Sequence, residues 1–132
     1  MKKATIQAVL QSDVKKVWDI ITDNEHFAWR SDLSKIDISP DGKSFTEYTK
    51  DGFPTVFTIT QKEAPRRYEF DLQNRNLRGH WVGTLRESGQ GTLLTMTEEV
   101  AVANPVMNLF AGAYLKKQQA QYLADLRRAL GE

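Results

Sequence analysis

Two acidic residues, Glu47 and Glu98, fall within otherwise apolar rows of predicted β-strands. Side chains alternate between the two faces of a strand, so each acid shares a face with apolar residues. These neighbours are Phe45 for Glu47, and Leu94, Met96 and Val100 for Glu98. A carboxyl group that faces an apolar cavity has a raised pKa, which suits it to proton transfer or to contact with a polar group of a ligand.

Two other environments would fit the same acids. A β-bulge would shift the register by one residue and turn a side chain to the opposite face. Alternatively, each acid lies at the rim of the cavity, paired with an arginine such as Arg30 or Arg78. We therefore assign no catalytic residue and predict the two acids as ligand contacts.

Aromatic residues on the same predicted inner face form the largest group of candidate ligand contacts. Together with a few hydroxyl groups they match the composition of a small-molecule pocket, although aromatic side chains also dominate ordinary cores. Tyr114, in the last predicted helix, adds a phenol that can reach such a pocket. The predicted ligand-binding residues are Glu47, Phe57, Phe70, Trp81, Met96, Glu98, Phe110 and Tyr114.

The chain has no cysteine, and its two histidines are poor candidates for catalysis or metal binding. Strand alternation turns His80 to the outer face. His26 has Asp23 and Glu25 nearby, but the three residues show no recognised metal-ligand spacing. The sequence also contains no glycine-rich phosphate loop, dinucleotide fingerprint or nucleophile elbow. We expect neither a metal nor a cofactor.

The elements that would carry these residues are a strand, a helix, six further strands and a long final helix. Residues 5–10 alternate with the strand period, after which Ser12 or Asp13 can cap an amphipathic helix. Strands follow at residues 33–39, 44–50, 55–63, 67–72, 78–86 and 92–101, separated by short turns rich in Gly, Pro, Asp and Asn. Asn104 and Pro105 can begin a helix that extends to Leu130.

Short connections between successive strands favour hairpins, and hence an antiparallel sheet. The long final helix has an apolar stripe that needs a sheet to cover it. We therefore predict an α+β fold, in which a curved antiparallel sheet of about seven strands wraps around the final helix and leaves an internal cavity. A chain of 132 residues fits a single domain, 1–132.

Composition excludes several classes of partner. The net charge is +1 and the basic residues are dispersed along the chain, which argues against nucleic-acid binding. No apolar run approaches the length of a membrane span, and the N-terminus does not resemble a signal peptide. We expect a cytoplasmic protein with no membrane insertion, and the sequence favours no particular oligomeric state.

The order of elements resembles the helix-grip fold of the SRPBCC superfamily, which includes START lipid-transfer domains and polyketide cyclase-like proteins. Three stretches are similar to the superfamily: residues 17–23 (VWDIITD) in the first helix, residues 63–68 (EAPRRY) at a turn between middle strands, and residues 91–95 (GTLLT) opening the last strand. The likeness covers nearly the whole chain.

This resemblance implies binding of a hydrophobic or amphipathic small molecule, such as a lipid, a polyketide-like compound or an aromatic compound, in an internal pocket. Two alternatives stay open, because one fold can host different functions. The first is an enzyme similar to polyketide cyclases and dehydratases, which would use a pocket Glu or Tyr. The second is a protein-interaction module similar to the activators of the heat-shock chaperone ATPase.

Overall fold

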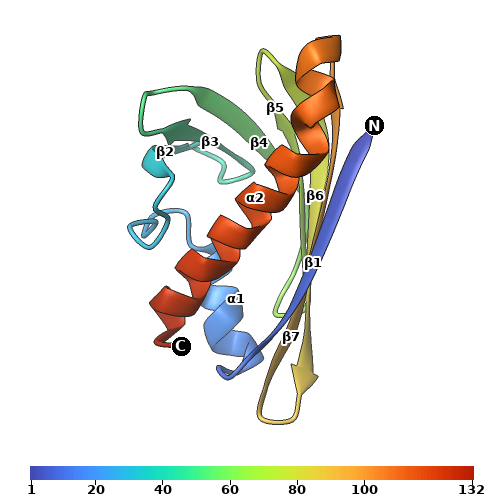
Figure 1. Cartoon of the computed structure of the whole chain (residues 1–132). Helices are drawn as coiled ribbons and strands as arrows, with labels where there is room; N and C mark the ends of the chain where they lie inside the picture. Colours follow the sequence, from blue (N-terminus) through green and yellow to red (C-terminus); the bar gives the residue numbers. More distant parts are fainter.

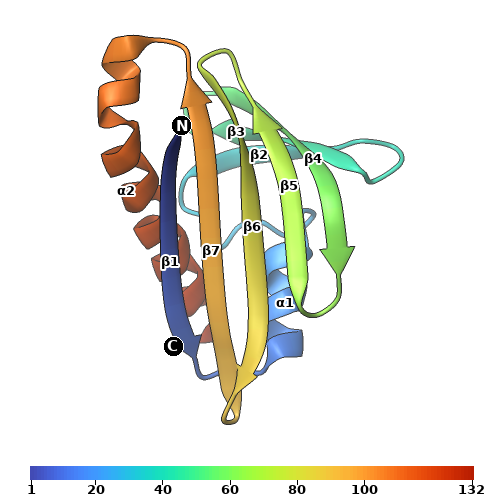
Figure 2. The same ribbon diagram turned by 90° about the vertical axis from the view of Figure 1, so that its right-hand side faces the viewer.

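The computed structural model describes residues 1–132 as one antiparallel sheet and two helices (Figures 1 and 2). The strands are β1 (Lys2–Leu10), β2 (Leu33–Ile38), β3 (Ser44–Thr49), β4 (Pro54–Glu63), β5 (Arg67–Gln73), β6 (Leu77–Ser88) and β7 (Gly91–Val102). The helices are α1 (Val14–Thr22) and α2 (Pro105–Leu130). The seven strands lie in the order β1-β7-β6-β5-β4-β3-β2, which confirms the predicted α+β fold.

Helix α2 lies across one face of the sheet, where it packs on β1 and β7 (Figure 1). Strands β2, β3 and β4 curve around the other side of the same face. Helix α1 contacts α2, β6 and β7. Neither helix is long and apolar enough to span a bilayer.

The register of the sheet points both predicted acids toward α2. In β7, Leu94, Met96 and Val100 are each about 1% exposed and share their face with Glu98, as predicted. Glu98 lies opposite Trp81 in β6 and Ala4 in β1. The register shifts of the sheet lie elsewhere, in β2 and in β4, so no bulge turns Glu98 outward.

Helix α1 forms where the strand period changes to the helical one. Asp13 caps it, since its carboxylate accepts a hydrogen bond from the Lys16 backbone N at 2.8 Å. Its buried face consists of Val17, Trp18 and Ile21. Trp18 meets Tyr68 of β5 edge to face, with ring centroids 6.0 Å apart. This contact fixes α1 at one end of the inner face of the sheet.

Helix α2 begins at Pro105 and is capped by Asn104, whose side chain accepts hydrogen bonds from the backbone N of Val106 and Met107. It ends at Gly131, where φ is 77°, a left-handed conformation that glycine adopts without strain. The residues buried along the helix are Ala111, Leu115, Gln119, Asp125, Leu126 and Leu130.

The prediction that Phe110 lines the cavity is wrong. Phe110 is 63% exposed and does not border the cavity. The buried stripe starts at Ala111 and advances by three or four residues, whereas Phe110 lies about 100° around the helix from Ala111. Leu109 is exposed as well, so hydrophobic character alone misplaces the contact face in the first turns of α2.

Candidate functional site

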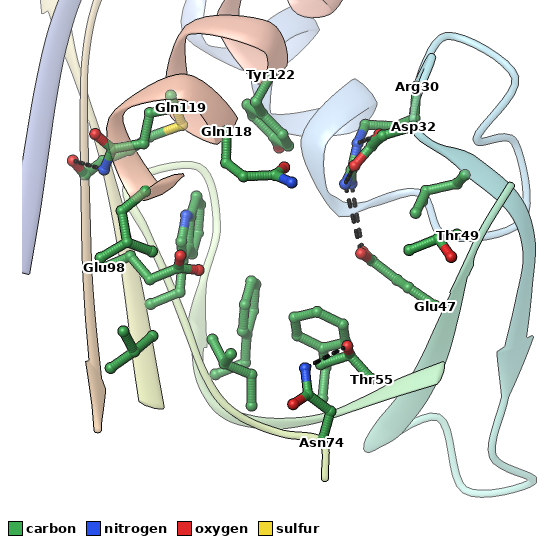
Figure 3. A pocket seen from close by; sticks show the side chains of 18 of the residues that line it. Arg30, Asp32, Glu47, Thr49, Thr55, Asn74, Glu98, Gln118, Gln119 and Tyr122 are labelled. Carbon is green, nitrogen blue, oxygen red and sulfur yellow. Dashed lines mark hydrogen bonds and ion pairs between the residues drawn. The ribbon is translucent and has the colours of Figure 1, made fainter. Parts of the chain in front are cut away.

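A cavity of about 170 Å³ lies between α2 and the inner face of the sheet (Figure 3). It is lined by 24 residues, of which 14 are hydrophobic. Strands β3 to β7, helices α1 and α2, and the segment that leads into β2 all contribute side chains. The sheet curves on the side of β3 and β4 (Figure 1), and residues of both strands line the cavity together with residues of α2.

One wall of the cavity is a continuous set of aromatic rings. Phe70 stacks on Trp81 with centroids 4.8 Å apart, and Phe45 stacks on Phe57 at 5.0 Å. Phe70 also meets Phe57 edge to face at 5.1 Å, which joins the two stacked pairs. The Trp81 ring lies over Gly83, where a Cβ atom would overlap it. Glycine at this position therefore leaves the room that Trp81 needs.

An arginine with two carboxylates forms the polar side of the cavity. Arg30 donates to both carboxylate oxygens of Asp32 at 3.1 Å and to those of Glu47 at 3.3 and 3.4 Å. The side chains of Arg30 and Glu47 are each 14% exposed. The Arg30 guanidinium also lies 5.0 Å from the centroid of the Tyr122 ring. Arg30 thus has carboxylate and aromatic partners on several sides.

Burial and charge shift the pKa values of this cluster. Burial raises the pKa of Glu47, and the Arg30 guanidinium opposes that rise. Burial alone would lower the pKa of Arg30, but the charges of Glu47, Tyr122 and Asp32 and the hydrogen bond to Asp32 together outweigh it and hold the value above its ordinary range. Arg30 therefore stays protonated and pairs with Glu47, which matches the predicted alternative of an acid paired with an arginine such as Arg30.

Glu98 faces the cavity from the side opposite Glu47 (Figure 3). Its carboxyl group has no ion-pair partner, in contrast to Glu47. Burial raises the pKa of Glu98 to about 7, with a further contribution from the charge of Glu47 and a partial opposing effect from Arg30. Glu98 can consequently hold or release a proton near neutral pH.

Two tyrosines add hydroxyl groups to the cavity. Tyr68 is 2% exposed and its hydroxyl oxygen has no hydrogen-bond partner. Tyr122 comes from α2, and burial raises its pKa. Both phenols are therefore neutral at physiological pH and can donate or accept one hydrogen bond.

A buried aspartate of α2 holds the segment that carries Arg30. The Asp125 side chain is fully buried, and it accepts hydrogen bonds from the Ser31 backbone N at 2.8 Å and from the Ser31 hydroxyl at 2.9 Å. Gln121 and Arg128 donate to its other oxygen at 2.9 and 2.8 Å. Since Ser31 lies between Arg30 and Asp32, Asp125 positions both of them.

Seven of the eight predicted ligand-binding residues line the cavity: Glu47, Phe57, Phe70, Trp81, Met96, Glu98 and Tyr114. Tyr114 is 54% exposed, and its hydroxyl accepts a hydrogen bond from Gln118 at 2.9 Å, which places it at the mouth of the cavity rather than inside it. The ligand-binding role of these residues stays a prediction.

Several polar residues of the site were not predicted. Among them, Asp32, Gln119 and Tyr122 line the cavity. The spacing of Leu115, Gln119, Tyr122 and Leu126 in α2 follows the buried stripe, so a helical periodicity that admits polar residues would have found two of them.

His80 lies on the outer face of the sheet, as predicted. Its ring nitrogens are 2.7 Å from Asp71 and 2.8 Å from Glu69. His26 is paired with Asp23 at 2.8 Å in an exposed segment. No three His, Asp or Glu side chains are grouped so that they could hold a metal ion.

A sheet that curves around a long C-terminal helix and encloses a cavity with it defines a START-like helix-grip protein. A model of the family described as "Polyketide cyclase / dehydrase and lipid transport" matches residues 1–131, and the chain belongs to this family. The resemblance to the SRPBCC superfamily is thereby confirmed.

Solved structures show the same fold at low sequence identity. A START superfamily protein from Mycobacterium smegmatis is 11% identical, with a TM-score of 0.85 over 98% of this chain and 97% of that chain. Protein MLL2253 from Mesorhizobium loti is 19% identical, with a TM-score of 0.82 over 98% and 97%. DynU16, from the dynemicin biosynthetic locus, is 18% identical, with a TM-score of 0.80 over 99% of this chain and 48% of that chain. No curated protein matches the sequence significantly.

Proposed function

We propose that this protein binds a small, largely apolar molecule in the cavity between α2 and the sheet, without transforming it. The observation that carries the proposal is the aromatic wall of a cavity in which 14 of the 24 lining residues are hydrophobic. Small-molecule sites in proteins have this composition. The family description, which includes lipid transport, supports the same class of function.

The size of the cavity limits what it can enclose. A volume of about 170 Å³ is close to that of an engineered apolar cavity of about 150 Å³ that binds benzene. The occupant is therefore a single-ring compound, or one end of a longer amphipathic molecule that emerges beside Tyr114. Covering about 150 Å² of apolar surface contributes roughly 4 kcal/mol before the costs of association.

The test replaces a residue that lines the cavity by a larger one, which should fill the cavity. Leu77 lines the cavity at the start of β6, and Leu77→Trp should occupy the space that a ligand needs. Val82→Trp introduces the same side chain on the outer face of the same strand and is the matched control. Urea denaturation of both variants establishes that they fold.

The readout has two parts. Native mass spectrometry of gently purified wild-type protein should reveal a retained small molecule, and calorimetry should detect binding of a neutral single-ring probe such as 2-phenylethanol. Leu77→Trp should abolish both signals and Val82→Trp should keep them. Equal binding by the folded Leu77→Trp variant would contradict the proposed site.

A cyclase-like or dehydratase-like reaction is the second candidate, favoured by Glu98. A carboxyl group whose pKa is about 7 can give a proton to a carbonyl or hydroxyl oxygen of a bound chain at neutral pH. The family description also includes cyclases and dehydrases. Loss of turnover in Glu98→Gln with unchanged affinity would favour this reaction over simple binding.

A further inference from the structure

The charged residues that line the cavity are unbalanced. They comprise three carboxylates, Asp32, Glu47 and Glu98, and a single cation, Arg30. Arg30 is already engaged with Asp32 and Glu47. The carboxyl group of Glu98 is therefore left facing the cavity without a cation to neutralise it. This surplus of negative charge would repel an anionic ligand and attract a cationic one.

Two glutamines of α2, Gln118 and Gln119, each keep an amide oxygen that has no hydrogen-bond partner. The Gln119 amide nitrogen donates to the backbone oxygens of Ala4 at 2.8 Å and Met96 at 3.4 Å, so only its carbonyl oxygen is left. The Gln118 amide nitrogen donates one of its two hydrogens to the Tyr114 hydroxyl at 2.9 Å, and its carbonyl oxygen has no partner. Both residues line the cavity. The Gln118 oxygen can therefore accept a hydrogen bond from a ligand.

The aromatic wall suits a cation as well as an apolar group. The faces of Trp, Tyr and Phe rings attract ammonium and guanidinium groups. Arg30 already shows this behaviour at the edge of the cavity, since it lies 5.0 Å from the centroid of Tyr122 and 5.8 Å from that of Trp29. The buried hydroxyl of Tyr68, which has no partner, offers a further acceptor within the same cavity.

We propose that the cavity is selective for a cationic ligand, an amine whose ammonium group pairs with Glu98 and whose apolar part contacts the aromatic wall of Phe57, Phe70 and Trp81. This inference rests on the proposed function, because it specifies the chemical class of the molecule that the same cavity binds. The ammonium group can donate to the Glu98 carboxylate.

Pairing with an amine should be coupled to ionisation of Glu98. The charged and titratable groups that face Glu98 across the cavity are Glu47 of β3, Arg30 and Asp32 of the segment before β2, Tyr68 of β5, and Tyr114 and Tyr122 of α2. Burial and Glu47 hold the pKa of Glu98 near 7, so an ammonium group that stabilises the carboxylate lowers this value. Amine binding below pH 7 should therefore release a proton.

The experiment compares three probes of nearly equal size: 2-phenylethylamine as the cation, 2-phenylethanol as the neutral compound and phenylacetate as the anion. Titration calorimetry at pH 6 and pH 8, in two buffers with different ionisation enthalpies, gives affinity and proton release. At pH 8 the amine should bind about ten-fold more tightly than the alcohol, the scale of a hydrogen bond to a charged group. Phenylacetate should bind most weakly.

Two matched variants test whether the selectivity depends on the negative charge of Glu98 rather than on the shape of the cavity. Glu98→Gln should abolish the advantage of the amine and its proton release, and it should leave alcohol binding within about two-fold of the wild-type value. Glu99→Gln changes the adjacent residue, which faces outward and lies 3.5 Å from Lys3, and should leave all three affinities unchanged.

The outcomes distinguish the two proposals. If the alcohol binds but the amine has no advantage, or keeps its advantage in Glu98→Gln, the selectivity for cations is wrong and the binding function stands. If phenylacetate binds more tightly than the amine, the selectivity is also wrong. If none of the three probes binds, the proposed function fails and the inference fails with it.

Discussion

Glu98 is expected to destabilise the folded protein at neutral pH and, at the same time, to contribute to ligand binding. A carboxyl group that faces an apolar cavity without a cationic partner is costly to ionise. An acid in such a place weakens the folded state at neutral pH. Replacing it should consequently improve folding while altering what the cavity binds, a combination expected of functional sites.

The first prediction concerns the stability of Glu98→Gln. The folded-state pKa of about 7 lies above the ordinary value of 4.5, so the unfolded chain ionises Glu98 at a lower pH than the folded protein does. Stability is therefore lost as pH rises from about 4.5 to about 7. The variant should match wild type at pH 4 and exceed it by about 1–3 kcal/mol at pH 8, measured by urea denaturation.

Glu99→Gln is the control for this measurement, because Glu99 is adjacent in β7 but faces outward beside Lys3. Its free energy of unfolding should stay within about 0.5 kcal/mol of wild type at both pH values. A difference between Glu98→Gln and wild type that is the same at pH 4 and pH 8 would show that the Glu98 carboxyl group is not perturbed.

At the scale of elements, the junction between α2 and the segment before β2 determines the polar side of the cavity. Asp125 of α2 accepts four hydrogen bonds, two of them from Ser31. Arg30 and Asp32 flank Ser31 and line the cavity. The position of the arginine thus depends on a carboxylate that does not line the cavity.

The second prediction is that Asp125→Asn destabilises the protein by about 2–3 kcal/mol, because the amide group of Asn cannot accept from all four donors and leaves buried groups unpaired. The free energy of unfolding at pH 7 measures this. Asp37→Asn is the control: Asp37 is in β2, its side chain is 51% exposed and it lies 3.3 Å from Lys35. A loss for Asp125→Asn no larger than that for Asp37→Asn would show that the junction is not important for folding.

Element patterns predicted the fold better than they predicted the site. Alternation in β7 placed Glu98 correctly, because a strand without a bulge has a strict period of two. The hydrophobic stripe of α2 misplaced Phe110, since apolar residues in the first turns of this helix face solvent. Asp125 could not be found by hydrophobicity, because polar groups are buried only where tertiary partners satisfy them.

At the scale of the whole molecule, titrating groups on both faces of the sheet set the dependence of stability on pH. On the outer face, burial would lower the pKa of His80, but hydrogen bonds with Asp71 and Glu69 outweigh it and raise the value. The stabilisation from His80 is complete below the ordinary pKa of 6.5 and is lost as pH rises through the folded-state value. Glu98 inside the cavity changes stability in the same direction.

Hydrogen-bonded carboxylates determine how the stability of the fold changes at acidic pH. Burial would raise the pKa of Asp125 and of Glu132, but hydrogen bonds from the backbone and side chains of neighbouring residues lower both. Hydrogen bonds from Arg67 and His80 lower the pKa of Glu69 as well. Their stabilisation is present above their ordinary values and is lost as pH falls through the folded-state values.

The third prediction is therefore a stability maximum at about pH 4.5, with losses on both sides. Urea denaturation from pH 3 to pH 9 measures the profile. The double variant Glu98→Gln, His80→Gln should flatten the alkaline side and keep the acid-side loss that comes from Asp125 and Glu132, whose hydrogen-bond partners do not include His80. Stability that rises from pH 6 to pH 9 in the wild-type protein would contradict this assignment of the titrating groups.

Methyl NMR during a titration with 2-phenylethanol tests most directly whether the cavity is a binding site. This probe is neutral, so its binding does not depend on the selectivity for cations. The reporters inside the cavity are the methyl groups of Leu72, Leu77, Met96 and Val100. The reporters outside it are those of Val9, Val56, Val106 and Leu109, which are all exposed.

Binding in the cavity should shift the four inner reporters in a saturable way, because an aromatic ring placed among them changes their local magnetic field. The four outer reporters should not move. Shifts confined to Val106 and Leu109 would place the ligand on the exposed first turns of α2, and the absence of any saturable shift would leave the cavity without a ligand. Either result would contradict binding between α2 and the sheet.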